Sequence, residues 1–322
     1  MNMATRPLHR LVKLVSLLLM ATASAQPQNP PTASNRTASL QPLVDEAVNR
    51  TLEKFADQKL LTNQLAVTLV DLRDPAHPVQ ASSRGQEQIY PASVIKLFYL
   101  VAAHCWMEEG KLPETEELRR AMRDMIAHSY NEATGYVVDL LTGTTSGPEL
   151  PPAELEEWYH KRNAVNRYFA ALGYARINVN RKPWCEGPYG REIQSVKIHQ
   201  PNHRNWLTTD ATARLLTAIV TGQAVSATRS AEMLKLMERD PFAKSNDPDD
   251  QAHGFTGPAV PSGAKLWSKA GWTSETRHDA AYVELPDGAK FVLVTFTTDH
   301  ANEREIIPSV ARVVVEGMKA RQ

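Results

Sequence analysis

Apolar residues near the start of the chain recur at helical spacing and predict an amphipathic helix: Leu43, Val44, Ala47, Val48, Leu52 and Phe55. The next apolar segment, Leu65–Leu72, is dense in Leu and Val and is followed by Asp74-Pro75. This pattern predicts a strand that ends in a turn.

The middle of the chain, from Ser93 to about Ser262, has mainly helical patterning. The expected helices are Ser93–Glu109, Glu114–Ala127, Glu132–Leu141 and Pro152–Leu172, with a further one that Thr208-Thr209-Asp210 caps and that runs to Thr221 and Gly222. Between them, Asn178–Asn205 is polar and without periodicity. Loops of this length inside compact domains are uncommon and often functional.

Strand patterns return at the end of the chain. Lys265–Thr273 predicts one strand, and Arg277–Leu285 with Lys290–Thr298 predicts a hairpin around Pro286-Asp287-Gly288. A last helix is expected over about Asn302–Met318. The predicted fold class is α/β: an antiparallel sheet flanked by N- and C-terminal helices, plus an inserted all-helical lobe. The α/β lobe would comprise about 39–92 and 262–322, and the helical lobe about 93–261.

The first 25 residues have the pattern of a signal peptide. Arg6, Arg10 and Lys13 form a basic region, Leu14 to Thr22 is apolar, and Ala23-Ser24-Ala25 is typical of a cleavage site. A membrane anchor is the alternative, but Leu14–Ala25 is too short for a hydrocarbon core of about 30 Å. We therefore expect a periplasmic or secreted protein with no membrane span after cleavage. Residues 26–38, rich in Pro, Asn, Ser and Thr, predict a flexible leader before the domain 39–322.

Removing the signal peptide leaves 33 Lys and Arg against 36 Asp and Glu, a formal net charge of −3. Near-neutral charge argues against nucleic acid or an anionic membrane as partner, and we expect a monomer that acts on a small substrate. Cys105 and Cys185 are the two cysteines. An oxidising compartment permits a disulfide between them, and two free thiols are the alternative.

Three short motifs occur in a fixed order: Ser93-Val94-Ile95-Lys96, Ser129-Tyr130-Asn131 and Lys269-Ala270-Gly271. A serine followed three residues later by lysine should arise by chance roughly once in a chain of this size. Such a second match, Ser262-Gly263-Ala264-Lys265, lies in a Pro/Gly-bounded loop before a strand. The order of the three motifs and the elements that carry them are therefore more informative than any one match.

The residue types in these motifs suit acyl transfer. A serine hydroxyl needs a group that takes its proton, and Lys96 lies on the same helical face as Ser93. The N-terminus of that helix can stabilise negative charge, and a desolvated lysine has a lowered pKa that lets it act as a base. Each motif also has a purely structural interpretation: an exposed helix lysine, an N-cap at Ser129, and an edge-strand lysine at Lys269 with a bulge or close backbone approach at Gly271.

With these motifs the chain resembles the serine β-lactamases and penicillin-binding proteins, and within them the class A β-lactamases. The resemblance extends to Tyr90-Pro91-Ala92 before the serine, to Ser129-Tyr130-Asn131-Glu132-Ala133-Thr134, and to the helix that Thr208-Thr209-Asp210 opens. It covers nearly the whole mature chain and implies a β-lactamase/transpeptidase-like fold that needs no cofactor.

The resemblance also implies roles for individual residues. Ser93 would be the acylated nucleophile, Lys96 its proton partner and Ser129 the proton shuttle to the leaving nitrogen. Asn131 would bind the amide side chain of the substrate, and Lys269 would supply positive potential. The backbone N–H groups of Ser93 and Trp272 would form the oxyanion hole, beside Gly271, and Arg277 would bind the substrate carboxylate, with a solvated strand-end charge as its alternative.

Several positions depart from the class A pattern. The interval between Ser93 and Ser129 is short, so one wall of the cleft is expected to be missing. Ala270 replaces a hydroxyl residue, and Tyr130 replaces an aspartate. The usual pattern around the deacylating glutamate is absent, which leaves Glu192 and Glu186 as alternatives. His199 and His203 have a spacing that can suit a metal, but with no third ligand indicated we expect solvated histidines and no metal site.

The sequence therefore favours an exported serine hydrolase that works through an acyl-enzyme on Ser93 and hydrolyses a β-lactam amide. Two alternatives use the same fold: a cell-wall D-Ala peptidase or acyl esterase with the same residues, and a non-catalytic protein that binds penicillin or peptidoglycan.

Overall fold

The computed structural model describes residues 33–184, 187–199 and 204–321. At its centre is an antiparallel sheet of six strands in the spatial order β2-β1-β6-β5-β4-β3. The strands are β1 (Leu65–Asp71), β2 (Val79–Ser83), β3 (Glu238–Arg239), β4 (Lys265–Trp272), β5 (Thr276–Glu284) and β6 (Lys290–Thr298). The predicted strands at the two ends of the sequence therefore form one sheet, because β1 pairs with β6 along its whole length.

The described residues form ten α-helices and three 3-10 turns. They are α1 (Ala33–Lys54), α2 (Lys96–Glu108), α3 (Glu116–Ala127), α4 (Asn131–Thr142), α5 (Pro152–Arg162), α6 (Ala164–Ala171), α7 (Gly190–His199), α8 (Thr209–Val220), α9 (Ala227–Met237) and α10 (Ile306–Lys319), with η1 (Thr62–Gln64), η2 (Ala92–Ile95) and η3 (Gly257–Ala259). No described helix is both long and apolar enough to cross a membrane.

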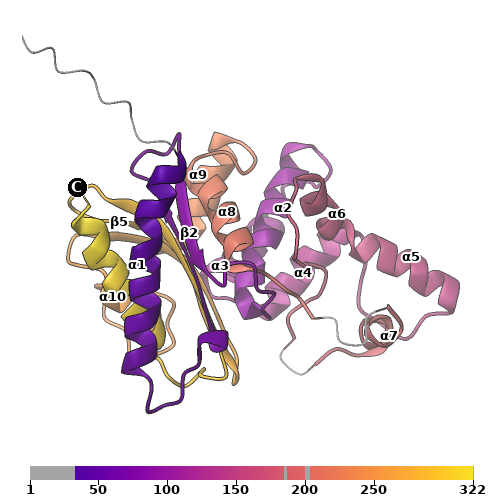
Figure 1. Cartoon of the computed structure of the whole chain (residues 1–322). Coiled ribbons are helices and arrows are strands. Elements are labelled where there is room, and N and C mark those ends of the chain that lie inside the picture. Colours follow the sequence, from indigo (N-terminus) through magenta and orange to yellow (C-terminus); the bar gives the residue numbers. More distant parts are fainter. Residues whose placement is uncertain (1–32, 185–186, 200–203, 322) are drawn as a thin grey trace, which may run out of the picture.

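The sheet is buried on both faces, and β6 shows why its sequence is continuously apolar. Phe291 and Leu293 belong to the core beneath α1 and α10, whereas Val292 and Val294 belong to the core shared with α2 and α8. Successive side chains of a strand point to opposite faces, so such a run fits a strand with helices on both sides. Figure 1 shows α1 and α10 side by side on one face, with the helical lobe extending away on the other side.

The predicted architecture is confirmed: an antiparallel sheet carries the terminal helices and stands beside a helical lobe. Two predicted helix starts are close to those observed. The Thr115 hydroxyl caps α3 by accepting from the Leu118 N–H, and the Thr208 hydroxyl caps α8 by accepting from the Ala211 N–H. Such caps satisfy N–H groups that have no partner inside the helix.

The predicted helix Pro152–Leu172 is divided into α5 and α6 at Asn163. The side-chain amide of Asn163 donates to the Tyr159 carbonyl, and its oxygen accepts from Asn166 and Asn180. Asparagine side chains that bond the backbone in this way compete with helical hydrogen bonding. The periodicity of apolar residues continues through both helices and so did not reveal the break.

Two further predictions of secondary structure differ from the structure. The segment Asn178–Asn205, predicted to be irregular, contains the helix α7, whose buried residues are the polar Glu192 and Ser195. A helix that buries polar side chains has no apolar periodicity to detect. In addition, α1 begins at Ala33, inside the stretch 26–38 that was predicted to be a leader. The predicted signal peptide and Cys185 lie outside the described residues, and Cys105 is a free, buried thiol in α2.

His278 in β5 connects the sheet to the segment that precedes α2. Its Nε2 lies 2.8 Å from the Tyr90 carbonyl oxygen, and its Nδ1 accepts a hydrogen bond of 3.1 Å from the Thr297 N–H. These partners require a neutral ring with the proton on Nε2. Burial lowers the pKa of His278 to about 4, and burial likewise lowers the pKa of His104 in α2 to about 4.

The two histidines predict how stability depends on pH. In the unfolded chain each histidine takes up a proton near pH 6.5, but in the folded protein it does so only near pH 4. The contribution of the two neutral histidines to the free energy of unfolding is thus fully present above pH 6.5 and is lost as the pH falls towards 4. We expect the free energy of unfolding to fall by about 1.4 kcal/mol per pH unit for each histidine in this window. Urea denaturation at a series of pH values measures this slope. His104→Leu should lower the slope by about 1.4 kcal/mol per pH unit, the contribution of one histidine. An unchanged slope would contradict the lowered pKa of His104.

Candidate active site

Ser93 lies in the 3-10 turn η2, directly before α2, so the predicted helix Ser93–Glu109 begins with a tighter turn than expected. Ala92, the residue before it, has φ of +45°, a left-handed conformation that is unfavourable for residues other than glycine. Strained backbone of this kind concentrates at functional sites. Ser93 is half-buried, whereas Lys96, the first residue of α2, is completely buried.

Ser129 lies between α3 and α4 and also has a left-handed backbone, with φ of +59°. The Lys96 Nζ donates to three oxygens there: the Ser129 carbonyl at 2.5 Å, the Ser129 Oγ at 3.2 Å and the Asn131 Oδ1 at 2.8 Å. The first two motifs are therefore in direct contact, although 33 residues separate Lys96 from Ser129.

Lys269 reaches the same hydroxyl from β4. Its Nζ lies 3.0 Å from the Ser129 Oγ and also donates to the Gln251 Oε1 at 2.7 Å and the Ala270 carbonyl at 2.7 Å. Burial, together with the positive charge of Lys96, holds the pKa of Lys269 well below its usual range. Two lysine nitrogens donate hydrogen bonds to the Ser129 Oγ. The hydrogen of this hydroxyl can therefore be donated to another group that accepts it.

Gly271 brings β4 against the turn that carries Ser93. A Cβ atom at this position would lie 2.6 Å from the Ser93 nitrogen and 2.8 Å from the Val94 nitrogen. Of the two structural alternatives for Gly271, a bulge or a close backbone approach, the structure shows the second. β3 pairs only with Leu266 and Trp267 of β4. The same edge of β4 beyond Trp267 is therefore not covered by β3, and β4 contacts η2 there. Trp272, at the end of this edge, is 38% exposed.

Gln251 joins the two lobes at this point, and the sequence carried no signal for it. Its amide nitrogen donates to the carbonyls of Ile126 and Ala127, at the end of α3. Its Oε1 accepts from the Lys269 Nζ and, at 3.1 Å, from the Ala270 N–H. A buried amide that uses all four of its bonds in this way is costly to replace. Gln251 therefore fixes the segment before Ser129 relative to β4.

Arg277 lies in β5, where it pairs with Trp272 of β4, and it is not a solvated strand-end charge. It is 2% exposed, and its terminal nitrogens donate to Asp249 and to the Gly254 carbonyl, each at 2.8 Å. Its guanidinium also lies 4.1 Å from the centre of the Phe255 ring. Asp249 is shared with Arg304, and hydrogen bonds from the two arginines lower the pKa of Asp249 to about 2. These contacts occupy both terminal nitrogens of Arg277, and its predicted contact with a substrate carboxylate stays a prediction.

Glu192 belongs to a buried charge network of the helical lobe. Its Oε1 lies 2.8 Å from an Arg162 nitrogen and accepts a hydrogen bond of 2.8 Å from the Ser146 hydroxyl. Lys182 lies 4.0 Å from the same carboxylate and 2.7 Å from Asp139, which is 3.4 Å from Arg162. Desolvation raises the pKa of Asp139. Two cations and two carboxylates thus tie α7 and its preceding segment to α4 and α5.

This network gives Glu192 a structural role, and its role as deacylation base stays a prediction. The alternative, Glu186, lies outside the described residues, as does His203. His199 stacks on Tyr159 at a ring distance of 3.9 Å. Within the described parts of the chain, no group of three or more potential ligands is placed to hold a metal ion.

The side chains of Ser262 and Ala270 both lie outside the hydrogen bonds around the Ser129 hydroxyl. Ser262 is exposed in the turn before β4, whereas Lys265 lies in β4 itself, so they share no helical face. The Ala270 methyl group is buried in a small apolar cluster with Phe255 and Ile307. A hydroxyl at this position would have to be accommodated beside those side chains.

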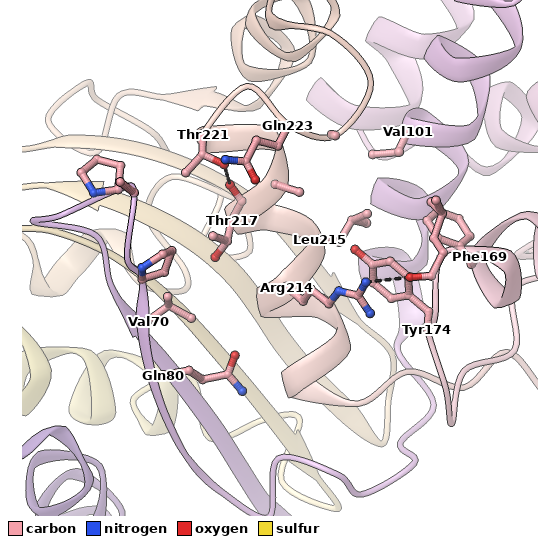
Figure 2. A pocket seen from close by; sticks show the side chains of 16 residues that line it. Val70, Gln80, Val101, Phe169, Tyr174, Arg214, Leu215, Thr217, Thr221 and Gln223 are labelled. Atoms are coloured by element: carbon pink, nitrogen blue, oxygen red, sulfur yellow. Dashed lines mark hydrogen bonds between the residues drawn. The ribbon is translucent and has the colours of Figure 1, made fainter. Parts of the chain in front are cut away.

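A hollow of about 490 Å³ lies away from these motifs, between the β1–β2 edge and α8 (Figure 2). Its walls include Val70, Tyr174 and Arg214, and Arg214 donates to the carbonyls of Leu172 and Gly173. None of the three motifs contributes to its lining. Volume alone therefore does not identify the reactive centre.

The fold and the convergence of three motifs on the Ser129 hydroxyl define a β-lactamase-like serine hydrolase architecture. Comparison with known proteins agrees with this class: the sequence pattern of the beta-lactamase enzyme family matches residues 112–318. The chain belongs to that family. No curated protein sequence matches the chain.

Solved structures share the fold at low sequence identity. A beta-lactamase from Sphaerobacter thermophilus DSM 20745 has a TM-score of 0.61 and 21% identity, with 87% of this chain and 98% of that chain covered. A beta-lactamase from Chitinophaga pinensis DSM 2588 has a TM-score of 0.62 and 18% identity, covering 84% and 99%. A mutant of PBP-A, solved as an acyl-enzyme complex with penicillin G, has a TM-score of 0.61 and 18% identity, covering 86% and 97%.

The Gln251 contacts predict a specific change in pH dependence. Lys269 loses its positive charge as the pH rises through its lowered pKa. Gln251→Glu places a carboxylate where Oε1 now lies 2.7 Å from the Lys269 Nζ, and this charge should raise the pKa of Lys269. We measure the rate at which a penicillin modifies Ser93 as a function of pH. We expect the alkaline limb of this pH profile to move to higher pH.

Gln251→Met is the matched control, because it removes the same amide without adding a charge. It should slow modification about 10-fold or more, from lost hydrogen bonds to buried groups, without moving the limb to higher pH. Identical profiles for the two variants would contradict the proposed link between Gln251 and Lys269.

Proposed function

We propose that the protein is a serine hydrolase that forms an acyl-enzyme on Ser93 and hydrolyses β-lactam amides. The observation that carries the proposal is the placement of Lys96 and Lys269 at 3.2 Å and 3.0 Å from one hydroxyl, that of Ser129. A structural interpretation treats each motif separately, and two parts of it are wrong: Lys96 is completely buried rather than exposed, and the N-cap residue of α4 is Tyr130, not Ser129. It does not explain why two buried lysines converge on one serine beside the turn that holds Ser93.

In the proposed acylation, Lys96 starts as a neutral amine and takes the proton of the Ser93 Oγ as this oxygen attacks the lactam carbonyl carbon. The N–H groups of Ser93 and Trp272 would stabilise the oxyanion, an effect worth about 10²–10³ in rate for each donor. The C–N bond then breaks as the leaving nitrogen takes the Ser129 proton, and Lys96 passes the proton that it took from Ser93 to the Ser129 oxygen. Attack by water on the ester releases the acid and restores the Ser93 hydroxyl.

Substrate recognition is proposed to use groups around this centre. Asn131 would bind the amide of the acyl side chain while its oxygen holds Lys96. Lys269 would attract the substrate carboxylate. The penicillin G acyl-enzyme known for PBP-A, a protein of the same fold, supports a β-lactam as the first substrate to test.

A second candidate function is slow or absent turnover after acylation, as in a penicillin-binding or peptidoglycan-binding protein. The observation that favours it is the pairing of Glu192 with Arg162, which commits that carboxylate to the helical lobe. A peptidase or esterase acting on cell-wall acyl groups would use the same centre. The rate at which a penicillin labels Ser93 and the rate at which the label is released distinguish these candidate functions.

We also propose export to the periplasm or medium and action as a monomer. The support is the basic, apolar and small-residue order of the first 25 residues and the near-neutral charge of the mature chain.

Acylation should occur on Ser93 and not on Ser262. Intact-mass and peptide mass spectrometry after exposure to benzylpenicillin should place the adduct on the Ser93 peptide, and Ser93→Ala should abolish it. Ser262→Ala is the control and should label normally. An adduct on Ser262, or undiminished turnover by Ser93→Ala, would refute the assignment.

Glu192→Gln separates the structural role of this carboxylate from a catalytic one. Removing the charge of Glu192 leaves Asp139, at 3.4 Å, as the remaining carboxylate beside the buried Arg162, so we expect a loss of about 3 kcal/mol in the free energy of unfolding, the lower end of the range for a broken buried pair. Urea denaturation measures it. If Glu192 is the deacylation base instead, the variant should acylate normally and remain labelled, with little change in stability. Glu156→Gln, an exposed change nearby, is the control.

A further inference from the structure

His278 in β5 and Gly271 in β4 form a cross-strand pair that meets the turn carrying Ser93. The two residues lie directly opposite each other in the sheet, and opposite residues of an antiparallel pair lie on the same face. A Cβ atom at Gly271 would lie 2.6 Å from the Ser93 nitrogen. On the same face, the His278 ring reaches Tyr90, three residues before Ser93. The proposed reaction steps give His278 no role, although it contacts the segment that leads to the nucleophile.

The imidazole of His278 is held rigidly inside the protein and has no exposed surface. Its Nδ1 accepts a hydrogen bond of 3.1 Å from the Thr297 N–H, so the ring proton is on Nε2, which donates to the Tyr90 carbonyl at 2.8 Å. The ring also packs against Phe296, with the ring centres 4.5 Å apart. Because Thr297 and Phe296 both belong to β6, the sheet fixes the direction in which Nε2 donates.

The Tyr90 carbonyl lies at the start of the strained part of the turn. Pro91 follows, and it has no N–H group with which the chain could be held. Ala92 comes next, with its left-handed φ of +45°, a conformation that persists only where the surrounding contacts enforce it. The hydrogen bond from His278 therefore fixes the chain just before the two residues that set the direction of the Ser93 N–H.

The direction of this N–H is important for the proposed chemistry. A donor in an oxyanion hole stabilises the transition state only if it is aimed at the position that the oxygen then occupies. Catalytic groups have to be held within about 0.5 Å of that geometry. The close approach of Gly271 and the hydrogen bond of His278 hold the turn from two neighbouring strands, β4 and β5, both of which contact η2.

We propose that His278 is a positioning residue of the active site, which aims the N–H and the hydroxyl of Ser93 at the substrate carbonyl group through its hydrogen bond to the Tyr90 carbonyl. The inference rests on the proposed acyl-enzyme chemistry at Ser93 and adds to it a residue that does not touch the substrate. The positioning role requires the donor at Nε2. A residue that only stabilises the interior would need its two hydrogen bonds equally.

Two substitutions separate the two hydrogen bonds of His278. The amide of asparagine ends at the position of Nδ1, so His278→Asn keeps an acceptor for the Thr297 N–H and loses the donor to Tyr90. The longer side chain of glutamine brings its amide nitrogen to the position of Nε2, so His278→Gln keeps the donor and loses the acceptor. Each variant loses one buried hydrogen bond, and urea denaturation should show a similar loss of stability in both.

The dependence of the acylation rate on benzylpenicillin concentration gives the first-order rate constant of acylation and the dissociation constant of the complex that precedes it. We expect His278→Asn to lower the rate constant about 10-fold, the effect of one lost hydrogen bond to a buried group, with the dissociation constant unchanged. His278→Gln, the conservative variant, should restore the rate constant. Equal rate constants in the two variants, or a loss confined to the dissociation constant, would overturn the inference.

Hydrogen–deuterium exchange separates this inference from the acyl-enzyme proposal, because it requires no substrate. The Val94 N–H donates to the Pro91 carbonyl at 3.1 Å within the same turn, and its exchange rate, followed by NMR, measures local opening of the turn. We expect exchange about 10-fold faster than in the wild type for His278→Asn and a rate near that of the wild type for His278→Gln. This result would support the positioning role even if Ser93 is never acylated.

Equal exchange of the Val94 N–H in the two variants would overturn the inference, whether or not Ser93 reacts. If His278→Asn does not fold, His278→Gln carries the test alone. Exchange near the wild-type rate in this variant supports the positioning role, because the donor to Tyr90 then suffices, and exchange about 10-fold faster overturns it.

Discussion

The structure depends on a buried junction of two lysines at one serine hydroxyl. Lys96 comes from the helical lobe and Lys269 from the sheet, and both are completely buried. Positive charge on both amines is disfavoured by their mutual repulsion and by lost hydration, and the oxygen acceptors around them stabilise the charge that they carry. Carbonyl, amide and hydroxyl oxygens of Ser129, Asn131, Gln251 and Ala270 supply those acceptors.

This requirement explains several features around the junction. The left-handed backbone at Ser129 turns both its carbonyl and its hydroxyl towards Lys96. Gln251 supplies an acceptor to Lys269 and ties α3 to β4 with its remaining bonds. The absence of a side chain at Gly271 lets β4 approach the Ser93 turn. The lobes therefore meet through hydrogen bonds to charged groups, which make their relative position specific.

The sequence predicted those parts of the fold and site that depend on local periodicity or a short motif. The hairpin of β5 and β6, the cap at Thr208, and the close approach at Gly271 are of this kind. Gln251 was not predictable, because its importance comes from partners that are distant in the sequence. The roles of Arg277 and Glu192 were expected from resemblance, but the contacts of both depend on tertiary neighbours, Asp249 and Arg162, that no local pattern identifies. Helix α7 was missed for the related reason that it buries polar residues.

A crystal structure of the protein after reaction with benzylpenicillin tests the central claim most directly. We predict an ester on the Ser93 Oγ, with its carbonyl oxygen between the N–H groups of Ser93 and Trp272, and with the Ser129 Oγ still within hydrogen-bond distance of both lysine nitrogens. An ester on another residue, or a Ser129 hydroxyl that has separated from Lys96 and Lys269 in the adduct, would contradict the account.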